Sequence, residues 1–400
     1  MSAPLAEDEV DPGLAALRQL AAGVAAPLPV AGIHMEGCAQ GWRRGALIAA
    51  VPVRDEEGRI ERCLDALDAD LLPDDGVIVL ANGCTDGTVP LALARMARWS
   101  RPWLLVRCTW QPGHGGAPLA RRLALDFAHA AAPHAALLSV DGDTVVLPGL
   151  RAAYEAEFAA GFDLVCGRIG FLPEEAAALP PADPVSEAVL REYRETSRHL
   201  AALFLPDADN PWPHHGNIGG ANFAIRGAAY ACVGPLPTPP FGEDRALRRA
   251  CEAAGLRIRY SDGPRVQTSC RLVGRTPGGL ADELRRNRTQ DDPVVDEALE
   301  APDTLLVRLS SRRSFLVSDD AAERAAILAA LGLDPGTAVE LSVEGGVAGW
   351  QRAEDLSPRL QRTRLRLSDL RCHLPALRRL MDATRAAPSG TPQFPPSPRG

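Results

Sequence analysis

The sequence predicts an α/β protein with a mainly parallel sheet flanked by helices. Between residues 45 and 147, short apolar stretches rich in Val, Leu and Ala alternate with longer amphipathic stretches. Continuous apolar runs are typical of strands buried on both faces, as in parallel sheets. Strands that alternate with helices in this way are joined by crossover connections, which cover both faces of the sheet.

The predicted elements follow one another in a regular order. Strands are expected at residues 45–53, 76–83, 103–108 and 135–140, and helices at 56–72, 88–99 and 118–131. In the first of these helices Ile60, Leu64 and Leu67 share one apolar face. Residues 1–44 are rich in Ala, Pro and Gly and are expected to form an irregular leader with a weak helical stretch at 14–22.

A second series of elements is expected after residue 150. It contains a strand at 162–167, a helix at 184–205, a loop at 207–217, a glycine-lined strand at 219–226 and a loop and helix at 241–255. Asp183 followed by Pro184 is typical of the start of a helix. The main domain is therefore predicted to span residues 45–288.

The remaining residues predict a small C-terminal extension. Residues 289–386 are expected to be mixed α/β, with a strand at 304–317, a helix at 322–332 and a basic amphipathic helix at 360–381. Such a helix can lie on a membrane surface, although packing against the main domain is the commoner arrangement. The Pro-, Ser- and Gly-containing tail at 387–400 is expected to be disordered.

Composition excludes several classes of partner. The net charge is −8, every side-chain cation other than His is Arg, and no dense basic run is present, so nucleic acid is not an expected partner. The nine cysteines are scattered and form no CxxC pair, which favours reduced thiols in a cytoplasmic protein. The first residues are acidic rather than signal-like, and the apolar run at 46–53 is too short to be a transmembrane segment.

Residues 137–147, LLSVDGDTVVL, carry two carboxylates in alternate positions after an apolar run. In extended chain the side chains of Asp141 and Asp143 share a face, so both can approach one divalent cation. Aspartates also begin turns and cap helices, so this motif alone is a weak signal.

Polar residues also follow two other strands at their carboxyl ends, where ligands of parallel sheets bind. These residues are Arg54, Asp55 and Glu56 after the first strand, and Asn82, Thr85 and Asp86 after the second. Together with Asp141 and Asp143 they predict a site along one edge of the sheet.

Taken in order, five segments resemble motifs of the family 2 glycosyltransferases, nucleotide-sugar enzymes of the GT-A fold. They are VPVRDEE from Val51, LANGCTDGT from Leu80, DGD from Asp141, GGANFAIR from Gly219 and GEDRAL from Gly242. The resemblance covers roughly residues 45–285. It implies a nucleotide-sugar half at 45–147 and an acceptor half at 148–288.

The resemblance implies a donor site and a metal site. Asp141 and Asp143 are the expected ligands of Mn²⁺ or Mg²⁺, which would stabilise the departing diphosphate as a Lewis acid. The expected donor-binding residues are Pro52, Arg54, Asp55, Glu56, Asn82, Asp86, Arg122, Asp141 and Asp143. Arg121 also stands where the family often keeps a cation, and Arg271 and Arg275 lie in a segment able to fold over the diphosphate, although arginines are abundant in this chain and each is expected to be solvated.

The acceptor side is implied in the same way. Asp244 is the candidate catalytic base for an acceptor hydroxyl and Glu243 is the second candidate. An acidic helix start that serves only the helix dipole is the alternative for this pair. The expected acceptor-binding residues are Trp212, His214, His215, Gly220 and Asn222. A structural loop histidine remains an equal alternative for each imidazole.

The implied activity is sugar transfer from a nucleotide diphosphate to a hydroxyl of a small molecule, glycan or lipid-linked acceptor, with inversion. The chain departs from the family at Ala81, where a base-reading Asp is usual, and at Arg54, where an aromatic residue is usual. The nucleotide base therefore stays open. The alternatives are a degenerate sugar-nucleotide-binding or scaffold protein, and a sugar-phosphate nucleotidyltransferase, whose glycine-rich first turn is missing after Val51.

Overall fold

The computed structural model describes residues 23–25, 28–38, 42, 44–275 and 278–386. The predicted helical stretch at 14–22 and the predicted disordered tail lie outside the described residues. The chain divides into two compact units. The first unit lies within residues 1–179 and 215–281, and the second within 180–214 and 282–400.

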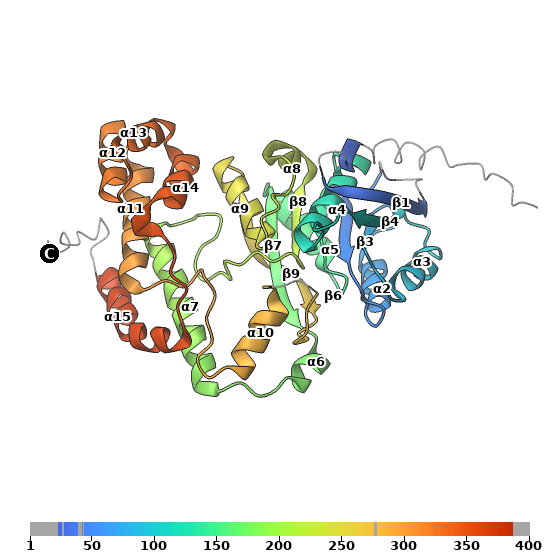
Figure 1. Cartoon of the computed structure of the whole chain (residues 1–400). Coiled ribbons are helices and arrows are strands. Elements are labelled where there is room, and N and C mark those ends of the chain that lie inside the picture. Colours follow the sequence, from blue (N-terminus) through green and yellow to red (C-terminus); the bar gives the residue numbers. More distant parts are fainter. Residues whose placement is uncertain (1–22, 26–27, 39–41, 43, 276–277, 387–400) are drawn as a thin grey trace, which may run out of the picture. The chain divides into compact units, whose positions relative to one another are not determined.

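The first unit contains a nine-stranded mixed sheet with the strand order β1-β4-β3-β2-β5-β8-β7-β9-β6 (Figure 1). The strands are β1 (Val30–Cys38), β2 (Leu47–Val53), β3 (Gly76–Asn82), β4 (Trp103–Trp110), β5 (Ala136–Ser139), β6 (Thr144–Val146), β7 (Leu164–Phe171), β8 (Phe223–Arg226) and β9 (Ile258–Thr268). The pairings of β4 with β3, β3 with β2 and β2 with β5 are parallel. Strand β8 pairs antiparallel with both β5 and β7, β7 pairs parallel with β9, and β9 pairs antiparallel with β6.

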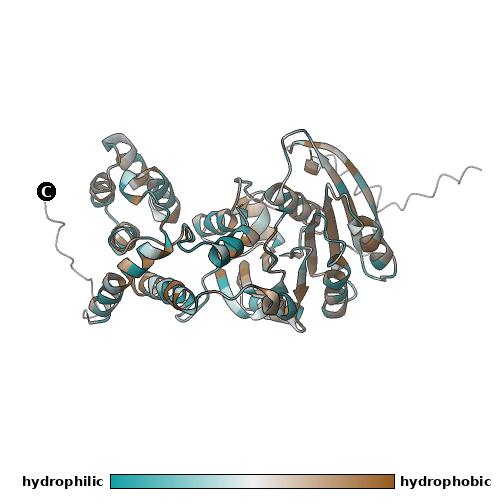
Figure 2. Cartoon of the chain, turned by 60° about the horizontal axis from the view of Figure 1, so that its bottom comes forward, coloured by the Kyte–Doolittle hydropathy of each residue, from teal (hydrophilic) through white to brown (hydrophobic). Residues whose placement is uncertain are grey.

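Helices cover both faces of this sheet, as the alternating pattern predicts. They are α2 (Ile60–Asp70), α3 (Thr88–Met96), α4 (Ala117–Ala131), α5 (Leu150–Ala159), α6 (Pro173–Ala178), α8 (Gly227–Val233) and α9 (Glu243–Ala253). Alternate residues of β2 enter different cores, because Ile48 packs with α4 while Ala49 packs with α2. Figure 2 shows the apolar strands between helices that each turn a hydrophilic side outward. The predicted α/β fold class is confirmed.

The expectation of a wholly irregular leader is wrong. Residues Val30–Cys38 form β1, which pairs antiparallel with β4 and makes one edge of the sheet. In this strand only Met35 is buried, and Gly32 and Gly37 interrupt the apolar pattern. An edge strand that buries so little has no alternating signature to read from sequence.

The second unit is helical, and the expectation of a mixed α/β extension is wrong. Its helices are α7 (Pro184–Phe204), α10 (Leu280–Thr289, which begins at the boundary), α11 (Pro302–Val317), α12 (Ala321–Ala330), α13 (Pro335–Glu344), α14 (Gly346–Leu356), the 3₁₀ turn η1 (Pro358–Leu360) and α15 (Leu367–Ala386). The apolar stretch at 304–317 is helix α11 rather than a strand. Its buried residues Leu305, Arg308 and Leu309 recur at the i, i+3, i+4 spacing of one helix face.

The predicted domain boundary at residue 288 also differs from the structure. Helix α7 begins where predicted, with the Asp183 carboxylate accepting hydrogen bonds from the backbone N–H groups of Val185 and Ser186. It packs in one apolar cluster with α11 and α15, so residues 180–214 belong to the second unit. The amphipathic stripe of α15 is buried there, through residues such as Leu370 and Leu377. None of the described helices is both long enough and apolar enough to cross a bilayer.

Candidate active site

The carboxyl ends of β2, β3 and β5 lie side by side in the first unit. Because these strands are parallel neighbours, the loops that follow them meet at one edge of the sheet. The DGD turn follows β5, and Gly142 at its centre packs so tightly that an added Cβ would lie 2.7 Å from Val53 Cγ2. Glycine is therefore required between Asp141 and Asp143.

Arg121, on α4, connects several of the segments singled out by the sequence. Its Nη2 donates to Asp141 Oδ1 at 2.7 Å and its Nε donates to Glu243 Oε1 at 3.0 Å. Its Nη1 donates to Ser139 Oγ and to Gly220 O, both at 2.7 Å. Burial alone would lower the pKa of Arg121, but the charges of Asp141 and Glu243 outweigh burial and raise it. This guanidinium is therefore a fixed cation.

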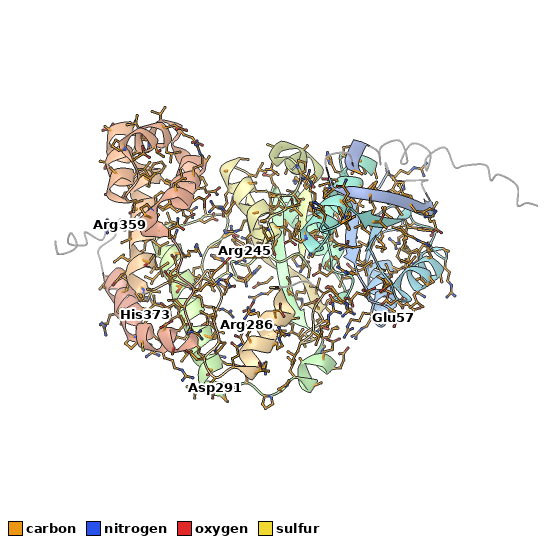
Figure 3. All side chains as sticks on the ribbon, viewed as in Figure 1. Glu57, Arg245, Arg286, Asp291, Arg359 and His373 are labelled. Atoms are coloured by element: carbon orange, nitrogen blue, oxygen red, sulfur yellow. The ribbon has the colours of Figure 1, made fainter. Side chains whose placement is uncertain are left out.

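Gly220 brings the two predicted acidic motifs together. Its carbonyl accepts from Arg121, and its N–H donates to Asp244 Oδ2 at 3.1 Å. A Cβ at Gly220 would lie 2.3 Å from the Arg121 guanidinium carbon, so only glycine allows this close approach. Asp244, in the first turn of α9, is thereby linked to Asp141 through Gly220 and Arg121. Figure 3 marks the next residue, Arg245, on the same turn.

Asp143 lies in a second part of the same network. Its Oδ1 accepts from the Thr268 hydroxyl at 3.1 Å, and its Oδ2 lies 3.2 Å from Arg271 Nη2. The Arg271 guanidinium also binds both carboxylate oxygens of Glu56, with Nη1 2.6 Å from Oε2. Strand β6 holds this arrangement, because Thr144 donates to Thr268 at 2.9 Å.

Two carboxylates of the network hold their protons more tightly than ordinary aspartates. Burial, reinforced by the charge of Asp141, raises the pKa of Asp143 to about 7, although Arg271 opposes the shift. Burial and then the charge of Glu243 raise the pKa of Asp244. A raised pKa suits a carboxylate that takes up a proton during a reaction.

Several predicted donor-binding residues instead stabilise the loops. Asp55, which has a φ of 52°, accepts from the Thr85 backbone N–H at 2.7 Å. Asp86 accepts from the Thr88 and Glu57 backbone N–H groups at 3.0 and 3.1 Å. These bonds tie the loops after β2 and β3 to each other.

The other predicted donor-side residues have varied surroundings. Asn82 is buried and its Oδ1 accepts from the Trp110 indole at 2.5 Å. Arg54 is half exposed and lies 4.0 Å from the Asp55 carboxylate, while Pro52 lies within β2. Arg122 pairs with Asp126 one helical turn away at 3.4 Å. Arg121, the neighbour expected to be solvated, is the arginine that the site uses.

Two predicted acceptor-binding residues are occupied by internal bonds. His215 Nδ1 accepts from the Asn217 backbone N–H at 3.3 Å and its Nε2 lies 3.2 Å from Cys166 O, which fits a neutral Nε2–H tautomer. Burial, and then Arg168, lower the pKa of His215. Asn222 is fully buried and bonds Tyr154, Arg168 and Pro264. Both side chains are therefore held by bonds within the first unit, and acceptor binding by His215 and Asn222 stays a prediction.

Trp212 and His214 belong to the second unit, apart from the other predicted acceptor residues. The Trp212 indole stacks on the His199 imidazole at a centroid distance of 4.7 Å and meets the His214 ring edge-on at 5.8 Å. One face of the indole is therefore already covered within this unit.

The acidic groups of the first unit suit a hard divalent cation. Asp141 and Asp143 supply oxygen ligands, which Mg²⁺ and Mn²⁺ prefer. Among the described residues no three His, Cys, Asp or Glu side chains are arranged as a complete metal cage. Mg²⁺ commonly binds through one or two carboxylates together with substrate phosphates, and this incomplete donor set fits that mode.

Thr268, Ser139 and the bridging role of Arg271 are functional features that sequence reasoning did not identify. Thr268 and Ser139 each end a strand, but nothing in the sequence connects Thr268 to the Asp143 carboxylate or Ser139 to the Arg121 guanidinium. Their contacts span 125 residues from Thr268 to Asp143 and 18 residues from Arg121 to Ser139. Only the pairing of β6 with β9 and of β5 with its neighbours brings them together.

No family model matches the chain, and no curated protein matches it. Solved structures similar to it include glucosyl-3-phosphoglycerate synthase from Mycobacterium tuberculosis in complex with phosphoglyceric acid, with 17% identity, a TM-score of 0.38 and coverage of 68% of this chain and 82% of that one. The same synthase in complex with Mn²⁺, uridine-diphosphate-glucose and phosphoglyceric acid gives the same values. S. aureus TarS is similar with 16% identity, a TM-score of 0.41 and coverage of 84% of this chain and 54% of that one. At such scores these similarities assign no activity to this chain.

Proposed function

We propose that the protein is a metal-dependent glycosyltransferase that moves a sugar from a nucleotide-diphosphate donor to an acceptor hydroxyl, with inversion. The observation that carries the proposal is the Arg121 network, in which the guanidinium joins Asp141 of the DGD turn, Gly220 of the GGANFAIR segment and Glu243 of the GEDRAL segment. These segments were selected from sequence independently of any contact. Their convergence in one unit supports a shared chemical task.

Each group in the network has a proposed part in the reaction. Mn²⁺ or Mg²⁺ bound at Asp143 and Asp141 supplies Lewis-acid stabilisation of the leaving diphosphate. Arg121 holds Asp141 in place and balances its charge. Asp244, fixed by the Gly220 N–H, accepts the proton that the acceptor hydroxyl loses when it attacks the anomeric carbon from the opposite side.

Asp244 is preferred to Glu243 as the base because of their surroundings. The Glu243 carboxylate is buried and committed to Arg121. Within the described residues, the Asp244 carboxylate accepts hydrogen bonds from the backbone N–H groups of Gly220 and Arg245, and its pKa is raised by burial and by Glu243. All nine cysteines are free thiols, which suits a reducing compartment, and we place the enzyme in the cytoplasm.

The first test is donor cleavage, which needs no known acceptor. Purified protein is incubated with a panel of sugar nucleotides and Mn²⁺ or Mg²⁺, and release of nucleoside diphosphate is measured. We expect one donor to be cleaved slowly, and EDTA, Asp143→Asn and Asp244→Asn each to reduce the rate by about 100-fold or more. A binding-only scaffold protein would bind a donor, detected as a raised melting temperature, and cleave none.

A matched control separates chemistry from charge loss. Asp262→Asn removes an exposed carboxylate of the same unit that pairs with Arg168 on β7. Its rate should equal that of the wild type. If Asp143→Asn and Asp244→Asn cleave the donor as fast as this control, the proposed function is wrong.

A further inference from the structure

The guanidinium of Arg271 lies between two carboxylates of the site, those of Asp143 and Glu56. Its guanidinium contacts Asp143 at 3.2 Å and grips both oxygens of Glu56. Glu56 is 5% exposed, so its charge is largely desolvated and depends on this partner. The guanidinium therefore reduces the repulsion between the two carboxylates, Glu56 and Asp143.

The two bridging arginines of the site differ in how firmly they are held. Arg121 is 5% exposed and also bonds two neutral oxygens, those of Ser139 and Gly220. The Arg271 side chain is 20% exposed, and within the described residues its guanidinium contacts the carboxylates of Glu56 and Asp143. Arg121 is thus a structural cation, while Arg271 has partners that respond to the charge of a ligand.

The backbone around Arg271 is anchored independently of its guanidinium. The Glu175 carboxylate of α6 accepts from the Ser269 hydroxyl at 2.6 Å and from the Cys270 N–H at 3.0 Å. The Glu175 carboxylate also forms an ion pair with Arg59, in the turn before α2, with Oε1 2.9 Å from Arg59 Nη2. The side chain can therefore change partner while its Cα stays in place.

The charge balance at the site leaves room for a further cation. Glu56, Asp141, Asp143, Glu243 and Asp244 are five carboxylates, and Arg121 and Arg271 are the two guanidiniums that bridge them. Arg59 reaches Glu56 only at 4.0 Å. A divalent cation at Asp143 would lie beside the Arg271 guanidinium, so the two positive charges compete for one carboxylate.

We propose that Arg271 is a displaceable counter-ion. Its guanidinium pairs with Asp143 while the donor is absent. When a divalent cation binds Asp143, the guanidinium pairs with the donor diphosphate instead. No covalent bond changes in this step, and Glu56 remains paired with Arg271 throughout. The exchange keeps the charge balanced at each stage. It makes the cation and the diphosphate bind together, because each removes the cost of binding the other. This inference rests on the proposed function.

The test measures Mn²⁺ binding by the full chain without nucleotide, with every variant at the same pH and ionic strength. Arg271→Gln should bind Mn²⁺ roughly tenfold more tightly than the wild type, because a like charge about 4 Å away has been removed. Asp143→Asn combined with Arg271→Gln should lose this gain. Arg62→Gln, which removes an arginine that pairs with Glu174 on the surface of the same unit, should leave Mn²⁺ affinity unchanged.

The second measurement adds UDP, GDP or ADP with saturating Mn²⁺. The nucleoside diphosphate that the wild type binds should bind Arg271→Gln at least tenfold more weakly, since two charge-assisted hydrogen bonds to phosphate are lost. Arg271→Lys keeps the charge without the fork of donors, so it should match the wild type for Mn²⁺ alone and bind the diphosphate with intermediate affinity.

The outcomes separate this inference from the proposed function. If Arg271→Gln folds, as judged by its melting transition, and binds Mn²⁺ no better than the wild type and Arg62→Gln, the counter-ion role is overturned even if donor cleavage is found. If Arg271→Gln gains Mn²⁺ affinity while the wild type cleaves no sugar nucleotide, the counter-ion role toward the cation stands and the glycosyltransferase proposal fails.

Discussion

At the scale of single residues, Asp143 shows how burial converts an ordinary carboxyl into a neutral-pH group. Its surroundings are a desolvated turn, the negative charge of Asp141 and one shared cation, Arg271. The ion pair with Arg271 reduces the cost of ionisation but does not cancel the cost of burial. The folded chain therefore holds a proton on Asp143 at pH values where the unfolded chain does not.

This difference predicts a pH dependence of stability. Between its ordinary pKa of 3.8 and about 7, Asp143 is protonated in the folded state and ionised in the unfolded state. The folded state then binds more protons, so the free energy of unfolding falls as the pH rises through this window. Relative to Asp143→Asn, the wild type should lose stability by on the order of 1 kcal/mol or more between about pH 4.5 and pH 8.

Urea unfolding in EDTA at both pH values measures this difference without bound metal. Asp262→Asn serves as control, because Asp262 is exposed and its pairing with Arg168 lowers its pKa rather than raising it. If the free energy of unfolding of the wild type, minus that of Asp143→Asn, stays constant or increases as the pH rises, Asp143 ionises normally in the folded chain.

The sequence predicts Arg122 as a donor-binding residue, whereas in the structure its neighbour Arg121 bonds Asp141 and Glu243. The two arginines are adjacent on α4, and successive helical residues point about 100° apart. Only the orientation of α4 on the sheet places Arg121 inward and Arg122 beside Asp126. The pattern of a single helix does not contain that information, because both residues are polar breaks in an otherwise apolar stretch.

At the scale of elements, the Arg121 side chain connects α4 to β5, to the segment before β8 and to α9. It bonds Ser139 at the end of β5, Gly220 before β8 and Glu243 at the start of α9. Removing one partner from a buried ion pair leaves the remaining charges without compensation. The Arg121 bonds should therefore contribute to the stability of the first unit as well as to the site.

We expect Arg121→Met to lower the free energy of unfolding by about 3–5 kcal/mol, because Asp141 and Glu243 lose their buried partner. Arg122→Met is the matched control, since it removes a neighbouring guanidinium that is 18% exposed and makes one longer contact, of 3.4 Å to Asp126, and it should cost about 1 kcal/mol or less. Chemical denaturation of both variants measures the difference. Equal losses would mean that the Arg121 bonds add nothing beyond ordinary helix surface charge.

Element prediction succeeded where a strand or helix buries a continuous apolar pattern. Strands β2, β3 and β5 and helix α2 fall within the expected ranges because Leu, Val and Ile fill their inner faces. It failed for β1, which buries only Met35, and for α11, whose β-branched and apolar residues also suit a strand. In α11 the tertiary partners, rather than local propensity, select the helix.

At the scale of the whole molecule, the chain builds two cores that are not consecutive in sequence. The first unit is interrupted by residues 180–214, which contribute α7 to the second unit. Buried residues of α7 such as Tyr193 and Leu200 pack with α15 residues such as Leu377. A linear division of the sequence at residue 288 could not reveal this exchange, since the helical pattern of α7 does not say which unit buries it.

This organisation predicts that the C-terminal helices cannot be removed cleanly. A chain ending at residue 281 keeps α7 but lacks α11 and α15, so Tyr193, Leu200 and Phe204 become exposed. We expect this chain to bind a dye that reports exposed apolar surface and to be cleaved rapidly by protease within α7. A chain ending at residue 386 should behave as the full chain does. Native-like hydrogen-exchange protection of α7 in the shorter chain would contradict the two-core assignment.

Because α7 pairs with α15, the two helices can pack together only after both have been synthesised. Glu192 on α7 finds Arg378 on α15 as its ionic partner, 186 residues farther along the chain. At translation rates of roughly 5–20 residues per second, about 10–40 seconds separate the emergence of the two helices. During that interval the sheet that follows α7 can complete its pairing. Until α15 emerges, the nascent polypeptide must carry the amphipathic helix α7 with the apolar residues Tyr193, Leu200 and Phe204 not yet covered by α15.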